Sequence, residues 1–396
     1  MRGLLKVLAM SLVVAVMTST AFLAGFGTSW FINHAQGRPL VAAGEPEQFG
    51  VFWEAWRIIQ REFYGQVPTA QEMTYGAIRG VIKTLDDPNT VFMDPRMSEL
   101  QRTDLRGKFE GIGAVVTMED GQLVVVAPME GQPAQKAGIR AGDIIIKVDD
   151  HEIVDMSLTE AVLLIRGPKG TTVRLTILRF GEPEPLVFEV VRGEIETPTV
   201  AWRLMEFKIG YIRLGLFGER TNAELSKAIR ELKQKGATAL ILDLRNNPGG
   251  YLNSSIEVAS QFIKEGIIAH ERWNDGRERS FRAARGGLAT DIPLVVLINK
   301  GSASASEIVA GAIQDHKRGV LIGERTLGKG WVQNVHQLSD GSTLHVTVAQ
   351  WLTPDGQQIS EEGIAPDIEV PLTEEDIQAG QDPQLQRALE YLKSQR

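Results

Sequence analysis

The chain of 396 residues contains no cysteine. That absence excludes disulfide bonds, thiolate-bound zinc, a cysteine nucleophile and a lipid-modified N-terminal cysteine. Basic residues are in the minority, since 42 Lys and Arg stand against 50 Asp and Glu, for a formal net charge of −8. A nucleic-acid-binding surface requires the opposite balance, so we predict no nucleic-acid partner. We interpret the acidic excess as a solvated protein surface.

One uncharged stretch occurs near the N-terminus, where residues 7–37 follow Arg2 and Lys6 and are most apolar at 7–26. About 20 apolar residues are enough to cross a bilayer, and basic residues before them keep the N-terminus inside. No clean A-x-A cleavage site follows this stretch. We therefore predict an uncleaved membrane anchor over residues 1–37, with the rest of the chain on the extracytoplasmic side.

Residues 48–105 carry apolar side chains at spacings of three and four, which is typical of helices. We predict an N-terminal helical domain here and expect its apolar face to pack in a core. This face consists of Phe49, Phe52, Trp53, Trp56, Ile59 and Phe63. The segment "LDDPNTVF" at 85–92 interrupts the helical pattern with proline and turn-forming residues.

The pattern changes at residues 106–193, where short apolar strands alternate with Gly, Asp and Pro turns. One helix is predicted among these strands, opening with the capping pair Ser157 and Glu160. Residues 194–372 alternate strands with amphipathic helices, which predicts an α/β core. Residues 373–396 are predicted to form a C-terminal helical tail.

The strand-rich region resembles a PDZ domain in the segments "GKFEGIGAVV" (107–116) and "PAQKAGIRAGDIIIKVDD" (133–150). A glycine-rich turn aims several backbone N–H groups at one point, and the strand after it offers an edge to an extended peptide. We expect the C-terminal carboxylate of a peptide to bind at this turn. The turn consists of Glu110, Gly111, Ile112 and Gly113.

Three segments of the α/β region are candidates for a shared site. They are "DLRNNPGG" (243–250), "KGSASASEIVAGAIQD" (300–315) and "GERTLGKGWVQ" (323–333). Taken singly, they have ordinary explanations as a turn, a helix cap and an exposed lysine in a loop. Each adjoins a predicted strand, so loops at the ends of a sheet can bring all three together.

A serine nucleophile in the second segment needs a base. If a helix begins at Ser304, His316 lies twelve residues further on, about 18 Å along the helix axis, which excludes a direct hydrogen bond. His270, His336 and His345 stay open as bases, although none has a recognisable triad setting.

Lysine is the other available base, and holding a lysine neutral near pH 7 requires an environment worth about 4 kcal/mol. Lys329 lies between two glycines and close to the apolar Leu327 and Trp331. If this segment is extended, Lys329, Trp331 and Gln333 share one face. Trp331 then shields the amine from water, and Gln333 orients it.

Acyl transfer also requires hydrogen-bond donors for the developing oxyanion. Gly249 and Gly250 follow a predicted strand and have no side chains to block their N–H groups. The Ala305 N–H lies beside Ser304 at a helix N-terminus, where the helix dipole favours negative charge. A glycine turn, a serine at a helix start and a packed lysine together match the requirements of a Ser–Lys hydrolase.

The order and content of these motifs resemble the S41 family of C-terminal processing (tail-specific) serine peptidases. The resemblance extends over residues 48–372 and includes "GAIRGVIKTLDDPNTVFMDP" and "WLTPDGQQISEEGIAPDI". It implies a mixed α/β fold, with a crotonase/ClpP-like catalytic core, an inserted PDZ domain and an N-terminal helical region. The segment "RNNPGG" stands where the family often has R-G-N-P-G-G, and it keeps the proline and both glycines.

Transferred to this sequence, the resemblance implies that Ser304 is the nucleophile, Lys329 the base and Gln333 the residue supporting that base. The backbone N–H groups of Gly250 and Ala305 are the implied oxyanion donors. No metal or cofactor is implied. Ser302 and Ser306 are expected to be structural neighbours of the nucleophile.

The implied function is endoproteolysis of exported proteins near their C-termini, with the accessible tail of the polypeptide substrate captured by the PDZ domain. Two alternatives compete with it. A trypsin-like protease normally places its catalytic motifs before its PDZ module, whereas here the module precedes the serine. A non-catalytic PDZ-containing scaffold or chaperone is the second alternative. The sequence leaves open whether the chain forms a homo-oligomer or uses an adaptor protein.

Overall fold

A computed structural model describes residues 49–360 and 362–395, which divide into two compact units at Met73. In the first unit, α2 (Phe49–Glu62) precedes the start of α3 (Ala70–Lys83). The prediction that the aromatic face of α2 packs in a core is wrong within the described residues. No residue of α2 is buried, and Phe63 is 58% exposed. The described part of this unit has no second layer that could cover the face.

The predicted anchor, residues 1–37, lies outside the described residues. Among the helices that the structure does describe, none combines the length and the apolar character needed to cross a bilayer.

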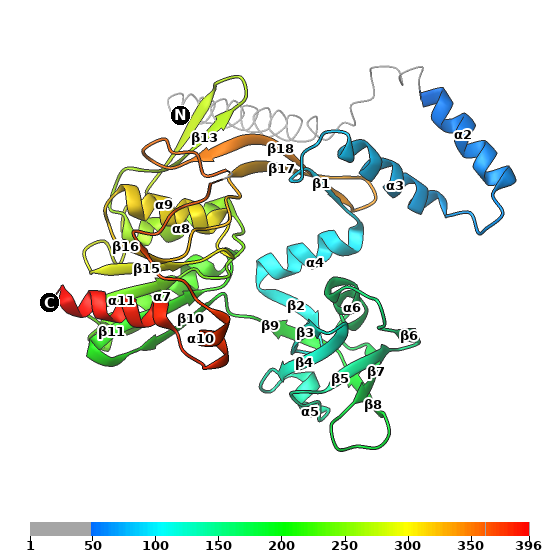
Figure 1. Ribbon diagram of the computed structural model, residues 1–396, viewed down its shortest axis with the longest axis horizontal. Helices are drawn as coiled ribbons and strands as arrows, with labels where there is room; N and C mark the ends of the chain where they lie inside the picture. Colours follow the sequence, from blue (N-terminus) through cyan, green and yellow to red (C-terminus); the bar gives the residue numbers. More distant parts are fainter. Residues whose placement is uncertain (1–48, 361, 396) are drawn as a thin grey trace, which may run out of the picture. The chain divides into compact units, whose positions relative to one another are not determined.

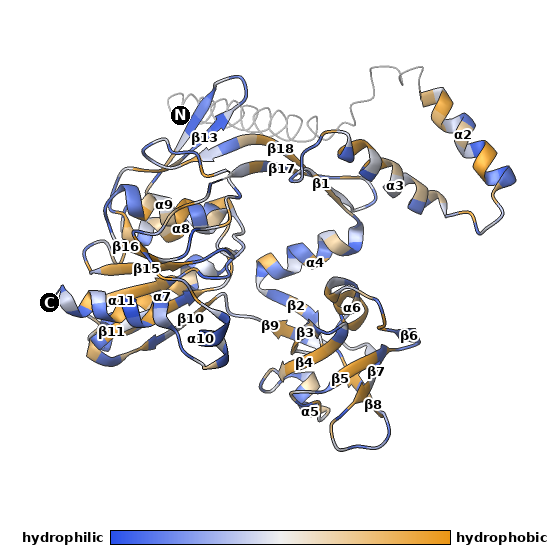
Figure 2. Ribbon diagram, viewed as in Figure 1, coloured by the Kyte–Doolittle hydropathy of each residue, from blue (hydrophilic) through white to orange (hydrophobic). Residues whose placement is uncertain are grey.

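The second unit is built on a six-stranded sheet in which every neighbouring pair except β10–β11 is parallel. In spatial order its strands are β10 (Val200–Leu204), β11 (Ile209–Leu214), β12 (Ala239–Asp243), β15 (Leu294–Ile298), β16 (Val320–Gly323) and β19 (Ile368–Glu369). All five residues of β12 and of β15 are buried, as expected for central strands covered on both faces. Figure 2 shows this concentration of hydrophobic residues on β15, which is coloured orange.

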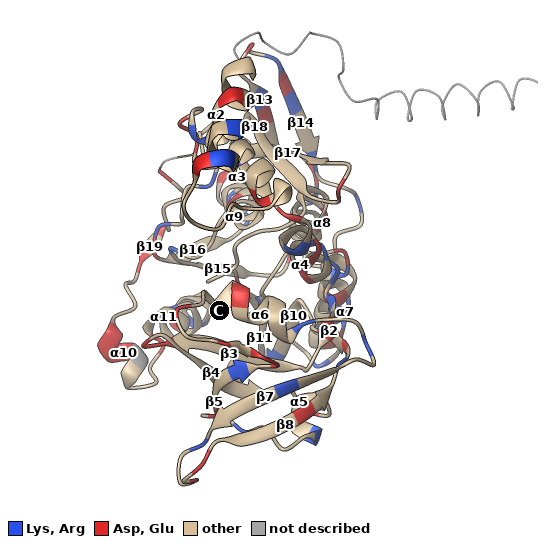
Figure 3. Cartoon of the chain, turned by 90° about the vertical axis from the view of Figure 1, so that its right-hand side faces the viewer, with Lys and Arg blue, Asp and Glu red and all other residues tan. Residues whose placement is uncertain are grey.

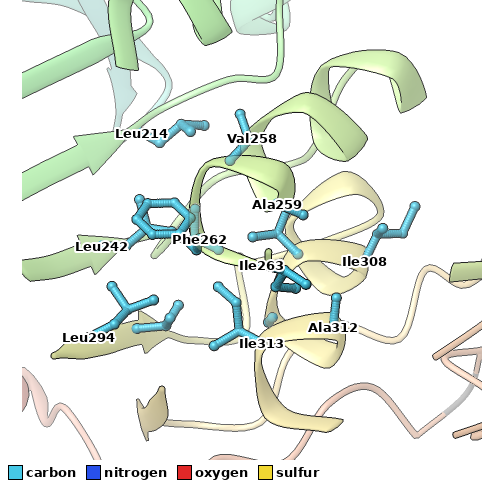
Figure 4. Packing of buried hydrophobic residues seen from close by; sticks show 14 of the residues in the cluster. Leu214, Leu242, Val258, Ala259, Phe262, Ile263, Leu294, Ile308, Ala312 and Ile313 are labelled. Atoms are coloured by element: carbon cyan, nitrogen blue, oxygen red, sulfur yellow. The ribbon is translucent and has the colours of Figure 1, made fainter. Parts of the chain in front are cut away.

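Helices cover both faces of this sheet. One face packs on α7 (Thr221–Gln234), α8 (Leu252–Phe262) and α9 (Ala305–Asp315) in a single apolar core. Figure 4 shows α8 and α9 facing each other in this core, with Phe262 beside Leu242 and Ile313 beside Leu294. The other face packs on α11 (Pro383–Ser394), whose Ala388 and Leu392 are buried. The segment expected to form a tail therefore supplies one layer of the core.

A second sheet, in which every strand pair is antiparallel, stands beside the first (Figure 1). It pairs β1 (Val91–Met93), β18 (Thr343–Leu352), β13 (Ile267–Trp273) and β14 (Glu278–Arg282), and β17 (Trp331–Gln337) also pairs with β18. The region expected to be a helical domain therefore contributes strand β1 to this sheet. It also contributes α4 (Pro95–Arg106), which Asp94 caps through the N–H of Met97.

The PDZ-like region forms its own sheet in the order β3 (Ala114–Glu119), β4 (Gln122–Pro128), β5 (Ile144–Val148), β7 (Thr172–Leu178) and β8 (Leu186–Val191). The short elements around it are β2 (Lys108–Gly111), β9 (Gly193–Glu196), β6 (His151–Glu152) and α5 (Pro133–Lys136). The predicted helix is α6 (Leu158–Ile165), and its capping box between Ser157 and Glu160 is confirmed. The remaining short helices are a 3-10 turn at Glu206–Lys208 and α10 (Glu374–Gln378).

Charged residues of both signs are distributed over the described chain (Figure 3). One ion pair differs from the surface pairs because Asp143 is only 1% exposed. The Arg179 guanidinium donates to both Asp143 carboxylate oxygens at 2.8 Å. Burial by itself raises the pKa of Asp143, but Arg179 and the Arg140 N–H outweigh it and lower the pKa overall.

We predict that Asp143→Ala destabilises the PDZ-like sheet by about 3–5 kcal/mol, because it leaves the Arg179 charge unpaired in a largely buried position. Amide hydrogen exchange of β5 and β7 in the full chain measures this loss. The matched control is Asp150→Ala, which removes an exposed partner of Arg174 and should cost less than about 1 kcal/mol. Equal protection of the β5 and β7 amides from hydrogen exchange in the two variants contradicts the prediction. Because the pKa of Asp143 is lowered by folding, its contribution is present at neutral pH and is lost as the pH falls through that pKa.

Candidate active site

The three candidate segments lie at one edge of the parallel sheet. They follow β12, β15 and β16, which are adjacent and parallel, so their carboxyl ends point the same way. In open α/β sheets this edge is where ligands bind. The structure therefore brings together the loops that sequence analysis predicted would meet.

The two outer serines of the S-A-S-A-S motif join two of these loops. Ser302 donates its hydroxyl to the Leu244 carbonyl at 2.8 Å, and Ser306 donates to the Asn247 carbonyl at 2.9 Å. Both side chains are fully buried. The Leu327 N–H donates to the Ser302 carbonyl at 3.0 Å and adds the third loop. These serines are therefore occupied in holding the loops together.

Ser304 is the partly exposed serine of the motif and lies immediately before α9. Its φ of 53° and ψ of −112° place it in a sparsely populated backbone region for a residue with a side chain. Such residues concentrate at functional sites. The Glu307 N–H donates to the Ser304 carbonyl at 2.9 Å. The Glu307 carboxylate in turn accepts the Ser304 N–H, so the start of α9 is closed by hydrogen bonds in both directions.

Glu307 connects the serine loop directly to the lysine loop. Its Oε2 accepts the Ser304 N–H at 2.7 Å and the Lys329 N–H at 3.0 Å. Its Oε1 accepts the Thr326 hydroxyl and the Gly328 N–H, both at 2.6 Å. The side chain is fully buried, and burial raises its pKa although these hydrogen bonds offset part of the effect.

The only signal for Glu307 in the sequence is its capping-box spacing from Ser304. Its other partners lie 19 to 22 residues further along the chain. No local pattern carries that information, because the contact depends on how two loops fold against each other.

The N–H groups of Gly250 and Ala305 have no hydrogen-bond partner within residues 49–360 and 362–395. The Gly249 N–H, in contrast, donates to Asn247 Oδ1 at 2.9 Å. Of the two glycines that sequence analysis considered, only Gly250 therefore has a donor available. Glycine is required at position 249 for a steric reason, since a Cβ atom there would lie 2.9 Å from Ser304 Cβ.

A cavity of about 760 Å³ includes Ser304, Lys329 and Gln333 among its lining residues. The prediction that Lys329, Trp331 and Gln333 share one face assumed that the segment is extended over all three residues. Strand β17 begins only at Trp331, so Lys329 lies before the strand. All three side chains nevertheless line the cavity. The Gln333 Nε2 donates to the backbone carbonyl of Asn89, a contact that the sequence did not indicate.

His345 of β18 also lines this cavity, whereas His270 and His336 are not among its lining residues. Burial, and secondarily the charge of Lys329, lower the pKa of His345. Its Nε2 lies 3.2 Å from the Thr343 hydroxyl. His345 is therefore a neutral neighbour of the site at physiological pH. Within residues 49–360 and 362–395, no cluster of three or more His, Cys, Asp or Glu residues could hold a metal ion.

The turn predicted to bind a peptide carboxylate joins β2 to β3. Glu110 and Gly111 belong to β2, and the Glu110 carboxylate accepts the Lys169 N–H at 3.1 Å. The N–H groups of Ile112 and Gly113 have no partner in the described part of the chain. Gly113 has a φ of 71°, and a Cβ there would lie 2.5 Å from Gln132 Cβ. Strand β3 lies at the edge of its sheet.

Comparisons with known proteins agree with this organisation. The model of peptidase family S41 matches residues 208–370, and a PDZ-domain model matches residues 124–179. A carboxy-terminal-processing protease of Bartonella bacilliformis is 43% identical over 324 residues, which is 79% of this chain and 74% of the relative. The chain belongs to peptidase family S41. The predicted family, mixed α/β fold and PDZ domain are thereby confirmed.

Further relatives extend the match beyond the catalytic core. The carboxy-terminal processing protease CtpA of Bacillus subtilis is 38% identical and covers 94% of this chain and 78% of its own length. A model of the N-terminal domain of the activating protease CtpB matches residues 33–97. Among solved structures, a photosystem II D1 C-terminal processing protease has a TM-score of 0.51 and 34% identity, covering 83% of this chain and 94% of its own.

We predict that Glu307→Gln lowers peptidase activity by about 10- to 100-fold and stability by about 1–3 kcal/mol. Each carboxylate oxygen accepts two donors, so an amide NH₂ group in place of either oxygen faces two donors it cannot satisfy. Cleavage rates and thermal unfolding of the full chain check both effects. The matched control, Glu257→Gln on the exposed face of neighbouring α8, should match the parent. Parent-like activity of Glu307→Gln contradicts the prediction.

Proposed function

We propose that this S41 chain is a serine endopeptidase that cleaves exported polypeptides near their C-termini, using Ser304 as nucleophile and Lys329 as base. The observation that supports this proposal best is the shared acceptor of the two residues. One Glu307 oxygen receives both the Ser304 and the Lys329 backbone N–H. This contact holds the two backbones close to each other at the wall of one cavity.

The reaction follows from the chemistry of these groups. Lys329 acts as the base that takes the proton of the Ser304 hydroxyl, and the Ser304 Oγ attacks the carbonyl carbon of the scissile bond. The N–H groups of Gly250 and Ala305 stabilise the oxyanion, since they have no partner within the described residues. The lysine then gives its proton to the leaving amine. Water hydrolyses the acyl-enzyme with the lysine again as base, and Gln333 orients the lysine.

Substrate capture is assigned to the PDZ domain. The N–H groups of Ile112 and Gly113, which lack a partner in the described part of the chain, suit a terminal carboxylate, and the edge of β3, which pairs with no further strand there, suits an extended chain. Thr159 of α6 and Asp104 of α4 line the catalytic cavity, and Asp104 pairs with Arg166 at 2.8 Å just after α6. Ligand-dependent control of access to the dyad by the PDZ domain is therefore part of the proposal.

The proposed location is the extracytoplasmic side of a membrane, with residues 1–37 as the anchor. The proposal includes no metal or cofactor. Whether the chain works as a homo-oligomer or with an adaptor protein is left to experiment. The alternative function is a non-catalytic PDZ-containing scaffold or chaperone.

We expect Ser304→Ala and Lys329→Ala each to lower cleavage of an unfolded polypeptide with an apolar C-terminus by about 10⁴-fold or more, as removal of a nucleophile or its base does elsewhere. Gel and mass-spectrometric product analysis measures this loss. His345→Asn is the control for a histidine base. Activity that survives Lys329→Ala but not His345→Asn contradicts the dyad. If the parent chain shows no cleavage even when a peptide tail is added, the result favours the non-catalytic scaffold.

We also expect amidation of the substrate's C-terminus to raise KM by about tenfold or more, because the turn at Ile112 and Gly113 then loses a charge-assisted acceptor worth about 1.5–3 kcal/mol. Steady-state kinetics on matched free-acid and amide substrates provide the test. Equal KM values for the two substrates contradict carboxylate capture and leave the dyad unaffected.

A further inference from the structure

The segment "LDDPNTVF" forms a tight turn whose acceptor is the Asp87 carboxylate. Asp87 accepts the Asn89 N–H at 2.9 Å and the Thr90 N–H at 3.0 Å. It also accepts the Thr90 hydroxyl at 2.6 Å and the Asn89 side-chain amide at 3.3 Å. Burial by itself raises the pKa of Asp87, but its hydrogen bonds lower that pKa to about 2. The turn is therefore held by an ionised carboxylate at any physiological pH.

This turn contacts the strand pair that carries Gln333. The Asn89 carbonyl accepts the Gln333 Nε2, and the Thr90 hydroxyl accepts the Thr347 N–H at 3.1 Å. Gln333 and Thr347 face each other across β17 and β18, directly after a register shift at which Val348 of β18 has no partner in β17. The turn thus contacts both strands at the point where regular pairing is disturbed. Thr90 is 5% exposed, so the contact is largely shielded from water.

The contact also determines which end of the Gln333 amide is available. A backbone carbonyl can only accept, so the amide must turn its NH₂ group toward Asn89. The Oε1 atom is then the end left for a second partner. A lysine amine offers N–H donors, and an acceptor for one of them leaves the nitrogen lone pair free for a serine hydroxyl. With the amide reversed, the Gln333 NH₂ group would face the N–H groups of the lysine, and no hydrogen bond could form between them.

We propose that Asp87 is a positioning residue for catalysis, acting through the Asn89 carbonyl to hold the Gln333 amide with its oxygen toward Lys329. This inference rests on the proposed function, because it assumes that Gln333 supports Lys329. Asp87 itself touches neither substrate nor the reacting atoms. Its effect is transmitted in two steps, through the hydrogen bonds that Asp87 accepts within the turn and through the one that Gln333 donates to the Asn89 carbonyl.

Asp340 offers a matched control. It lies in the turn between β17 and β18, and its carboxylate accepts the Ser342 N–H at 3.0 Å, the Ser342 hydroxyl at 2.6 Å and the Tyr75 hydroxyl at 2.7 Å. These hydrogen bonds lower the pKa of Asp340 to about 2, as in Asp87. Asp340 therefore reproduces the turn chemistry of Asp87 on the same strand pair, without a contact to Gln333.

The experiment measures kcat and KM of the full chain on a fluorescence-quenched unfolded polypeptide with an apolar C-terminus. Asp87→Ala should lower kcat by about 10- to 100-fold, the size expected for a misplaced catalytic group, with KM changed less than about threefold. Asp87→Asn keeps one acceptor oxygen, but its NH₂ group faces two donors in either orientation, so its kcat should lie between those of Asp87→Ala and the parent. Asp340→Ala should keep the parent kcat. A parent-like kcat for Asp87→Ala overturns the inference.

The double variant separates positioning from general destabilisation. If Asp87 acts through Gln333, adding Asp87→Ala to Gln333→Ala should lower kcat by less than about twofold more. Multiplicative losses in the double variant overturn the inference, because they show that Asp87 acts by another route. Ser304→Ala distinguishes the two levels of the proposal. If Ser304→Ala cleaves no substrate while Asp87→Ala has the kcat of the parent, only the inference fails. If Ser304→Ala cleaves substrate as fast as the parent, the proposed function itself is wrong.

Discussion

The arrangement of the site depends on one buried carboxylate. Glu307 receives N–H groups from the loop before α9 and from the loop before β17. Backbone N–H groups near a helix N-terminus require acceptors, and a buried carboxylate requires several donors. The Glu307 carboxylate supplies the acceptors and the N–H groups of the two loops supply the donors. The positions of Ser304 and Lys329 are therefore coupled through a single side chain. A substitution at Glu307 disturbs both positions together.

The parallel sheet provides the frame for this contact. Strands β12, β15 and β16 end at the same edge, and the two buried serines of the S-A-S-A-S motif bind the loop after β12 to the start of α9. The cores on the two faces of the sheet hold the strands in register. The site is therefore built on loops, but on loops whose ends and centres are tied to buried elements.

The antiparallel sheet adds a second set of constraints. Strand β1 pairs with β18, and the turn before it contacts Gln333 and Thr347. Helix α4, which follows β1, lines the cavity that contains Ser304 and pairs through Asp104 with Arg166 beside α6. A region with a mainly helical sequence pattern thus touches both the strand that carries Gln333 and the PDZ domain. The proposed control of access by the PDZ domain would act through these contacts.

The sequence by itself determined the mixed α/β class and the candidate residues, because strand and helix periods, glycine turns and the capping box at Ser157 are local patterns. The family followed from the resemblance of the motifs and their order. The sequence also singled out Ser304 and Lys329 as partners. Only the tertiary structure decided the other contacts of Glu307, the use of the Gly249 N–H by Asn247, and the contact between Gln333 and Asn89. It likewise showed that the pairing of β17 with β18 shifts beside Gln333 and that the aromatic face of α2 is exposed within the described residues. The reason is the same each time: these features depend on which distant backbone groups meet, and sequence periodicity does not encode such pairings.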